Sequence, residues 1–356
     1  MKKLLKNIFL LLNFVAVLGL LLSYLAIRIS PANWWIPAIF GLANPYLLLS
    51  NILFILLWLF TETKLIILSL AAIAIGYVQL SHYFQLSGQK SNENGITICS
   101  YNVKNFYGEP SKKRQEVAAD ILQYLQSKEA DIICLQEADL SGQNSFTKKN
   151  MQNKLPDASG LKYFHSSSVR GPVTYSRFPI IRKEEVRFPK TGNMIIQSDL
   201  KIDQDTIRLF NCHLESYHFS PKDIDSLDSI SFNKQEESYR RVRYTGSKLK
   251  QAFIKRAQQA ESLRQLISNS PYDVILCGDF NDTPVSYTYH TVSQGLEDAF
   301  VISGKGIGNT YAGKLPSFRI DYIFYSPGFN SFNFQVDQVE YSDHYPISCV
   351  LKKKDQ

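Results

Sequence analysis

The sequence has few cysteines, and no two of them stand close together. The five are Cys99, Cys134, Cys212, Cys277 and Cys349, and no CxxC pair or Cys/His cluster occurs. Structural zinc sites and disulfide scaffolds need closer or paired spacing, so we expect neither. Each cysteine lies in or beside a short apolar run, which predicts thiols buried in a core.

Charge is also scarce at the N-terminal end of the chain. Residues 1–90 contain six Lys or Arg and one acidic residue, Glu62, among long runs of Leu, Ile, Phe and Ala. The whole chain has a net charge of +7, and most of it belongs to this segment, so the remainder is nearly neutral. The high pI therefore does not by itself indicate a nucleic-acid-binding protein.

The apolar N-terminal segment is long enough to cross a membrane more than once. About 20 apolar residues span the hydrocarbon core of a bilayer, and the stretches 8–27, 36–60 and 65–86 reach that length. They predict a membrane segment over residues 1–86 with about three transmembrane helices. Pro37 and Pro45 predict a kink or a late start in the second. A cleaved signal peptide is the alternative for the first stretch, although two more apolar stretches follow it and no small-residue cleavage site stands out.

The few charges of this segment predict its orientation. Lys2, Lys3 and Lys6 precede the first apolar stretch, and basic residues favour the cytoplasmic side. Three spans would then place the C-terminal domain outside the cytoplasm. We therefore expect a multi-pass protein of the cell membrane with its large domain on the extracytoplasmic side.

After a polar linker at 87–95, apolar runs alternate with helical patterns and predict an α/β domain over residues 96–353. Helical spacing appears at 117–125 and 249–267. The predicted strands are 96–101, 131–135, 195–200, 206–213, 272–277, 320–325 and 347–351. Polar motifs follow several of these strands, and open α/β sheets place their sites at strand ends.

One basic run has two interpretations. Residues 223–250 lack clear apolar periodicity and predict a long surface insertion that runs into the following helix. Residues 234–264 hold nine Lys or Arg against three Glu. The run is typical of a solvated helix face, and it is also compatible with a patch for a phosphate-rich substrate or for anionic lipid heads.

Two predicted strands end in acidic motifs suited to phosphate ester hydrolysis, which needs a metal, an oriented water and hydrogen-bond donors. The run DIICLQE (131–137) ends in Glu137, a hard oxygen ligand of the kind that Mg²⁺ or Mn²⁺ prefers. The run CGDFNDTP (277–284) projects Asp279 and Asn281 from a Gly-bearing turn. Asp279 can orient or deprotonate water, and Asn281 can supply an amide contact. A simple Asx turn would explain the Gly and Pro, but not the matching acids elsewhere.

Histidines complete the pattern at two other strand ends. The run SDHYP (342–346) sets Asp343 beside His344 before the last strand, and Asp321 could orient that ring by accepting its N–H. His213 ends another strand, and Asn102 follows the first. Any one of these residues alone is more typical of a structural role.

Taken in chain order, the motifs resemble the endonuclease/exonuclease/phosphatase superfamily over about residues 95–353. That superfamily includes pancreatic-type deoxyribonucleases, abasic-site endonucleases, inositol polyphosphate 5-phosphatases and neutral sphingomyelinases. The resemblance implies a four-layer α/β sandwich of two packed mixed β-sheets with outer helices, here preceded by transmembrane helices. The matching positions are Asn102, Glu137, Gly171 to Pro179, His213, Asp279, Asn281, Asp321, Asp343 and His344.

The resemblance also implies a ligand set for a divalent cation, Mg²⁺ or Mn²⁺. Glu137 would hold the ion, with Asn102 close to it and Asp343 assisting.

Roles at the phosphate follow from the same resemblance. Asp279 would activate water, while Asn281 would position the phosphate or the nucleophile. His344, oriented by Asp321, would bind and stabilise the phosphoryl group. His213 would contact phosphate and protonate the leaving oxygen. Asn102 would also contact substrate.

These expectations describe a membrane-anchored, metal-dependent phosphodiesterase, an enzyme acting first of all on nucleic acid as an endonuclease or exonuclease. The alternative substrate is a phospholipid or inositol phosphate, because a tether at the bilayer raises the effective concentration of lipid. A relative that has lost catalysis and only binds is a third interpretation, which the filled catalytic positions disfavour. The sequence indicates no obligate protein partner.

Overall fold

The structure, a computed structural model, describes residues 2–91, 94–108, 111–140, 155, 160–167, 171–220, 223, 235–313 and 318–354. The helices are α1 Lys2–Leu25, α2 Ile36–Leu42, α3 Asn44–Leu59, α4 Ile66–Ile75, α5 Tyr77–Ser81, α6 Arg114–Ser127, α10 Gln235–Ser268, α11 Tyr287–Ser293 and α12 Ala299–Ser303. Short turns η1 and η2 cover Thr63–Leu65 and Lys104–Phe106. The strands are β1 Phe84–Gln85, β2 Ile96–Asn102, β3 Ile132–Ala138, β4 Tyr163–Ser166, β5 Gly171–Ser176, β6 Ile180–Arg187, β7 Met194–Ile202, β8 Asp205–His213, β9 Asp273–Asp279, β10 Glu297–Asp298, β11 Gly306–Ile307, β12 Asp321–Tyr325, β13 Phe329–Val336 and β14 Ile347–Lys353.

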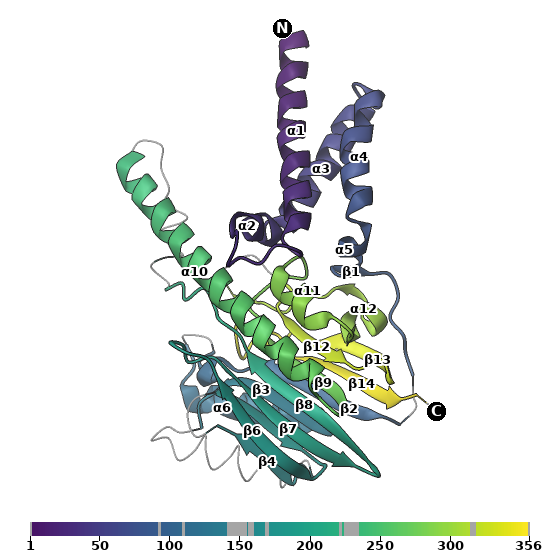
Figure 1. Cartoon of the computed structure of the whole chain (residues 1–356), viewed down its shortest axis with the longest axis vertical. Coiled ribbons are helices and arrows are strands. Elements are labelled where there is room, and N and C mark those ends of the chain that lie inside the picture. Colours follow the sequence, from purple (N-terminus) through teal and green to yellow (C-terminus); the bar gives the residue numbers. More distant parts are fainter. Residues whose placement is uncertain are drawn as a thin grey trace.

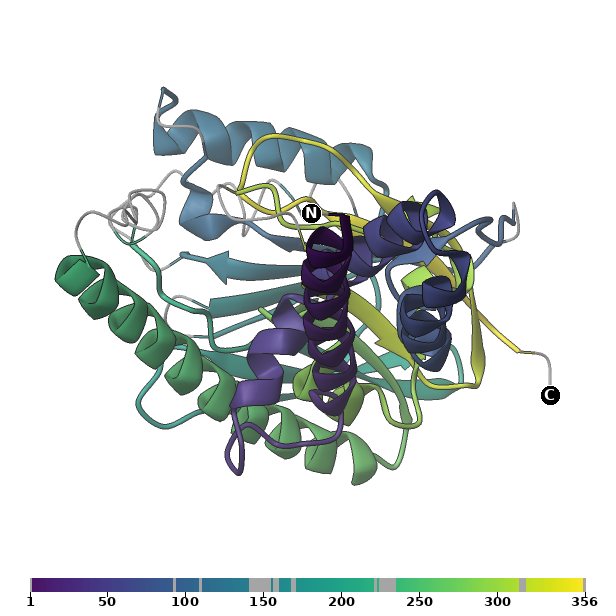
Figure 2. The same cartoon turned by 90° about the horizontal axis from the view of Figure 1, so that it is seen from above.

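The C-terminal part is the predicted four-layer α/β sandwich. One six-stranded sheet has the order β10-β12-β9-β8-β7-β6, and the other has the order β13-β14-β2-β3-β5-β4. Both are mixed, since β8 and β9 are parallel in the first, β2 and β3 are parallel in the second, and antiparallel pairs surround them. Figure 2 shows α6 and α10 on opposite sides of the two sheets.

Three apolar clusters hold the layers together. One lies between the sheets and includes Ile98 and Cys277, another packs α6 on its sheet, and the third packs α10 and α11 on the other sheet. All five cysteines are buried free thiols, which confirms the prediction made for them. Each predicted strand is confirmed to within a few residues, whereas seven strands were not predicted: β1, β4, β5, β6, β10, β11 and β13.

The first 86 residues form a bundle that stands on the sandwich (Figure 1). Within the described residues, α1 is long and apolar enough to cross a membrane. The second predicted span is broken, because α2 and α3 meet at an angle of 66°, and the third is an apolar helix only over Thr63–Ile75. The number of spans and the side of the membrane on which the sandwich lies stay predictions.

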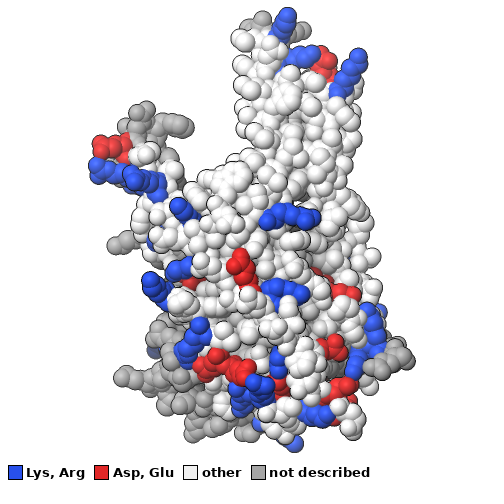
Figure 3. Space-filling view, viewed as in Figure 1, with Lys and Arg blue, Asp and Glu red and all other residues white. Residues whose placement is uncertain are grey.

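The bundle has its polar side chains inside. The amide of Asn13 donates to Ser69 at 2.7 Å and accepts from the indole of Trp58 at 2.8 Å, all three side chains being buried. Its surface is lined by exposed Leu, Ile and Phe side chains. Figure 3 shows this column as almost free of charge except at its far end, where Lys6 and Glu62 form an ion pair.

Several contacts fix the bundle to the sandwich. β1 pairs with β11 in antiparallel register, and the buried guanidinium of Arg319 donates to Asp298 at 2.7 Å and to the carbonyl of His82 at 2.9 Å. The segment predicted as a linker follows β13, where Asn333 exchanges hydrogen bonds with Ser91. The bundle and the sandwich therefore share a packed interface.

We predict that Gly41→Ala weakens this interface. A Cβ at Gly41 would lie 2.4 Å from the carbonyl oxygen of Val285 and 2.7 Å from the Cβ of Ala26, so α2 would have to move away from the loop after β9. Overpacking of this kind costs about 1–3 kcal/mol, and we expect a lower Tm for the full chain in detergent. Gly246→Ala is the control, because that helical position has open space and alanine favours a helix over glycine by about 1 kcal/mol. Equal Tm values for the two variants would contradict the prediction.

Candidate active site

The candidate site lies at the carboxyl ends of the two parallel strand pairs. Asn102 and Glu137 stand at the ends of β2 and β3 in one sheet, and His213 and Asp279 end β8 and β9 in the other. Parallel neighbours end at the same edge, so each pair presents two polar side chains together. The packing of the two sheets then brings all four residues into one place.

A buried amide pair joins the sheets directly behind these residues. The side-chain NH₂ of Gln136 donates to Oδ1 of Asn211 at 2.8 Å across the gap between the sheets. The NH₂ of Asn211 donates back to the carbonyl oxygens of Leu135 at 3.2 Å and Val173 at 3.0 Å. Since both amides are fully buried, these bonds fix the distance and register between the residue before Glu137 and the strand that ends at His213.

One amide also bridges the two carboxylates of the site. The Nδ2 of Asn102 donates to Asp279 Oδ2 at 2.9 Å and to Glu137 Oε1 at 3.2 Å. Asn105 Nδ2 donates to the other oxygen of Glu137 at 2.9 Å. Asn102 and Asp279 are each 1% exposed, so the carboxylates meet in a region largely shielded from water.

The backbone is under strain around this cluster. Glu137 has φ +50° and Asn281 has φ +52°, and residues 104–106 have φ values of +44°, +51° and +62°. Left-handed conformations are costly for residues other than glycine and gather at functional sites. The turn at 104–106 is what points the amide of Asn105 back to Glu137.

Gly278 allows β9 to deliver Asp279 to the cluster. Its φ is +154°, and a Cβ there would lie 2.1 Å from the carbonyl oxygen of Cys212 on β8. Beyond it, the backbone N–H of Asn281 donates to Asp279 Oδ1 at 2.8 Å, and its side-chain amide donates to Oδ2 at 3.2 Å and to the Leu214 carbonyl at 3.0 Å.

Burial raises the pKa of Asp279, and the neighbouring histidines and the amide of Asn102 offset this only in part. A carboxylate with a raised pKa is a suitable proton acceptor.

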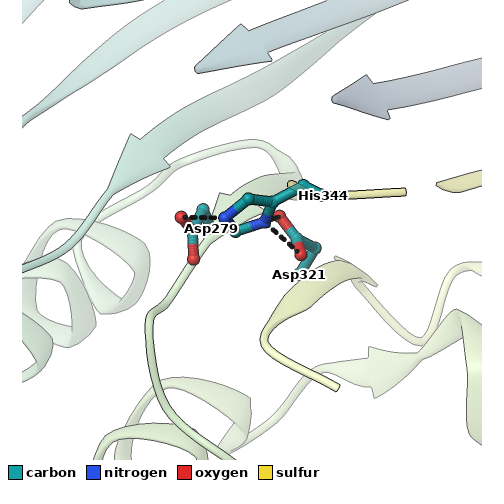
Figure 4. Close-up of side chains that lie close together, drawn as sticks. All are labelled: Asp279, Asp321 and His344. Atoms are coloured by element: carbon teal, nitrogen blue, oxygen red, sulfur yellow. Dashed lines mark hydrogen bonds and ion pairs between the residues drawn. The ribbon is translucent and has the colours of Figure 1, made fainter. Parts of the chain in front are cut away.

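His344 lies between two carboxylates, as Figure 4 shows. Its Nδ1 is 2.9 Å from Asp321 Oδ2, and its Nε2 is 3.7 Å from Asp279 Oδ2. Burial lowers the pKa of His344, but the charges of Asp321 and Asp279 outweigh it and raise the pKa to about 10. The ligand atoms of these three residues lie within 4.8 Å of one another, a spacing that could hold a metal ion. The two carboxylates hold the His344 ring in one orientation, with Nε2 directed at Asp279.

His213 supplies the feature that points to a ligand. Its Nε2 is buried and has no hydrogen-bond partner among the described residues. It lies 3.6 Å from Glu137 Oε1 and 3.7 Å from Asp279 Oδ2, beyond hydrogen-bond distance of both. An unpaired buried nitrogen between two carboxylates, with the amide of Asn102 beside them, suits hard oxygen ligands around a divalent cation and a phosphate oxygen.

Asp343 is placed differently from the other predicted residues. Its carboxylate forms an ion pair with Lys104 Nζ at 2.8 Å and accepts from the hydroxyl of Ser342 at 3.5 Å. The structure thus brings together Asn102, Glu137, His213, Asp279, Asn281, Asp321 and His344.

The sequence-based prediction of the site did not include Lys104 and Asn105. The only available signal was a second Asn three residues after Asn102, a residue type that tolerates left-handed backbone.

The basic run lies mostly on α10. The helix includes residues 235–250. These residues were predicted as part of a surface insertion because no apolar periodicity marks the first turns of the helix. Lys234 lies outside the described residues. Further along α10, Lys255 binds the buried carboxylate of Glu215 at 2.7 Å, two residues after His213.

Two family models match the chain. One, described as the Endonuclease/Exonuclease/phosphatase family, matches residues 99–344. The other, described only as a domain of unknown function, matches residues 6–83.

A curated relative is the CCR4-Not complex 3'-5'-exoribonuclease subunit Ccr4 of Aspergillus niger, 24% identical over 336 residues. The match covers 76% of this chain and 49% of the relative, so the chain spans about half the length of that protein.

Similar solved structures cover the sandwich. Danio rerio TDP2 complexed with a single-strand DNA product superposes with a TM-score of 0.53 at 17% identity, covering 73% of this chain and all of that one. An endonuclease/exonuclease/phosphatase family protein from Leptotrichia buccalis gives 0.51 at 17% identity, with 72% and 99% covered. One from Bacteroides vulgatus gives 0.51 at 15% identity, with 74% and 100% covered. At these identities the likeness establishes the fold.

We predict that Asn211→Leu destabilises the sandwich by at least about 2 kcal/mol. The substitution removes the shortest bond of the Gln136 amide, which keeps longer ones to Ser100 at 3.2 Å and to the Cys134 carbonyl at 3.4 Å. It also removes the side-chain donor to two buried backbone carbonyls, and a buried polar group that loses its partner costs about 1–3 kcal/mol. Urea unfolding of the full chain in detergent measures the loss. Asn269→Leu, at an exposed helix end, is the control and should stay within about 0.5 kcal/mol of the parent. The double variant Asn211→Leu with Gln136→Leu should lose less unfolding free energy than the sum of the two single variants. Fully additive losses would contradict a bond between Gln136 and Asn211.

Proposed function

The chain belongs to the endonuclease/exonuclease/phosphatase family, a family of phosphoester hydrolases, and from that premise we propose that it is a membrane-anchored phosphodiesterase dependent on Mg²⁺ or Mn²⁺. The observation that carries the proposal is the bridging amide of Asn102, bonded at 2.9 and 3.2 Å to carboxylates from two different sheets. It gathers acidic oxygens around the unpaired Nε2 of His213.

The proposed ligands of the cation are Glu137, Asn102 and Asp343. Glu137 would supply a carboxylate and Asn102 an amide oxygen, both hard donors. In this structure Oδ1 of Asn102 accepts from the backbone N–H of Lys104 at 3.0 Å, and its Nδ2 faces the carboxylates. Asp343 is the third, although its carboxylate pairs with Lys104 in this structure. A cation bound there would neutralise the phosphoryl oxygens of the substrate.

The remaining residues act on the phosphate and on water. Asp279, with its raised pKa, takes a proton from the attacking water, and Asn281 positions the nucleophile or the phosphate. His344 is held as a cation by Asp321 and donates from Nε2 to the charge that develops on the phosphoryl oxygen. His213 contacts phosphate and protonates the leaving oxygen.

Nucleic acid is the first candidate substrate. The Aspergillus niger relative is an exoribonuclease subunit by name, and the Danio rerio neighbour was crystallised with a DNA product. A phospholipid or inositol phosphate is the second candidate, and the specific observation in its favour is the apolar bundle packed on the catalytic sandwich. Hydrolysis of DNA, RNA, sphingomyelin and inositol phosphates by the full chain with Mg²⁺ separates these candidates.

Membrane anchoring is supported by the arrangement of the bundle. Its apolar side chains face outward and its Asn and Ser side chains are paired inside, the reverse of a soluble helical bundle. Basic residues stand at the far end of α1, where they would reach the opposite surface of a bilayer.

We predict that Glu137→Gln abolishes hydrolysis of a small soluble phosphodiester at ordinary Mg²⁺ because the carboxylate that holds the cation is lost. The fold should survive, since glutamine has the same shape. Turnover across a Mg²⁺ titration measures the loss of hydrolysis. Isothermal titration calorimetry with Mn²⁺ measures the loss of metal binding. Glu184→Gln on the edge strand β6 is the matched control and should bind metal and turn over normally. A normal rate for Glu137→Gln at ordinary Mg²⁺ would remove Glu137 from the ligand set.

We predict that Asp279→Asn and His344→Ala each lower kcat at least about 10²-fold, the scale of a general base or an electrostatic donor. The two losses should not multiply in the double variant, because both groups serve one transition state. Asp273→Asn, at the other end of β9, is the control. A double variant slowed by the product of the two single effects would show that the residues act independently.

A further inference from the structure

The N-terminal part of α10 extends beyond the sandwich. We call residues 238–250 the arm. In Figure 1 it projects past the sheets toward the side on which the α1–α4 bundle stands, while the C-terminal part of the helix packs on its sheet. Because the sandwich does not cover the arm, side chains there are available for another surface.

The arm combines positive charge with exposed apolar side chains. It holds five Lys or Arg and no Asp or Glu. Tyr239, Val242 and Tyr244 are 67%, 56% and 53% exposed. Arg243 is also exposed, and Arg240 pairs only at the surface with Glu236, at 2.7 Å. Figure 3 shows blue side chains on this projecting part, with red ones beside them at its tip.

The position of the arm places it at the base of the membrane bundle. Lys250 lies 5.9 Å from the ring centroid of Trp35, in the segment that joins α1 to α2, and Ser30 of the same segment donates to Glu261 of α10 at 3.4 Å. The neighbouring Trp34 is 45% exposed. Tryptophans at the end of an apolar helix favour the interface between bilayer and water, so α10 passes the bundle at that level.

We propose that the arm binds the anionic lipid headgroups of the bilayer that holds α1. Basic residues mixed with aromatic and aliphatic side chains on one helix suit the headgroup layer, where the charges meet phosphates and the rings enter the acyl boundary. A nucleic acid would also attract the charge. It would not account for exposed Val242 or for the place of the arm beside Trp35.

Lipid contact at the arm would reach the rim of the active site. Lys248 Nζ donates to the carbonyl of His218 at 3.1 Å, and Lys255 holds Glu215. Both acceptors lie in the loop that follows His213. The inference rests on the membrane anchoring proposed above and not on the proposed hydrolysis, so the two can fail separately.

The test uses the full chain in nanodiscs with a fluorophore at Val242→Cys. The native cysteines are all buried, so a thiol reagent should label position 242 selectively. Two kinds of nanodisc are compared, one of phosphatidylcholine alone and one that also contains phosphatidylglycerol. Both contain a lipid with a nitroxide near its headgroup, which quenches a fluorophore at the membrane surface. We expect stronger quenching with phosphatidylglycerol, and we expect the excess to disappear as salt rises.

Charge variants show whether the arginines cause this contact. Arg240→Glu with Arg243→Glu should lose the excess quenching, and Arg240→Gln with Arg243→Gln, which avoids a new acidic pair with Glu236, should lose part of it. The matched control is Arg182→Glu with Lys183→Glu on β6, an equal change of charge on an edge strand that Figure 1 places away from the bundle. The control should keep the excess. All variants should keep their Tm and their rate on a small soluble diester.

Two outcomes would overturn the proposal. Quenching that is equal in neutral and anionic nanodiscs would show that the arm does not recognise lipid charge. Unchanged lipid quenching in the Glu variant, together with weaker and less salt-dependent binding of single-stranded DNA, would assign the arm to a nucleic acid instead. Loss of diester hydrolysis in every sample, with normal quenching, would count against the proposed function and leave the lipid contact standing.

Discussion

The amide pair of Gln136 and Asn211 sets the spacing of the two sheets. Each amide is fully buried, and its bonds cross from one sheet to the other. A shift of one residue between the sheets would leave several polar groups without partners in an apolar interior, which costs far more than it gains. Glu137 is the residue after Gln136, and His213 lies two residues after Asn211, so this constraint also fixes side chains of the candidate site.

The site concentrates charge where the fold can support it. Asp279 and Asp321 are buried carboxylates on antiparallel neighbours, directly opposite each other in the register of β9 and β12. Two such groups would repel each other, and the His344 ring between them compensates by carrying a proton. Left-handed backbone at Glu137 adds strain to the same place. Three large apolar clusters stabilise the sandwich that carries both features.

The N-terminal bundle is coupled to this site through the buried Arg319. Its guanidinium holds the carbonyl of His82, just after α5, and stands two residues before Asp321. Val285, six residues after Asp279, packs against Gly41 at the other side of the bundle. Any tilt of the bundle therefore acts on the segments next to the two carboxylates, which end β9 and begin β12. A site fixed in this way has a constant position relative to the N-terminal bundle.

The sequence alone predicted seven of the fourteen strands in the described part of the chain and the polar residues at their ends. Burial on both faces produces long apolar runs, and a carboxylate or imidazole at the end of such a run is conspicuous. The sequence did not reveal β6, whose half-exposed faces carry charge, or the first turns of α10, which pack against little. Tertiary structure alone decided which strand ends meet, and it added Asn105 through a left-handed turn and paired Asp343 with Lys104. Local patterns record whether a residue is buried, whereas distances between residues more than a hundred positions apart are set only when the two sheets pack.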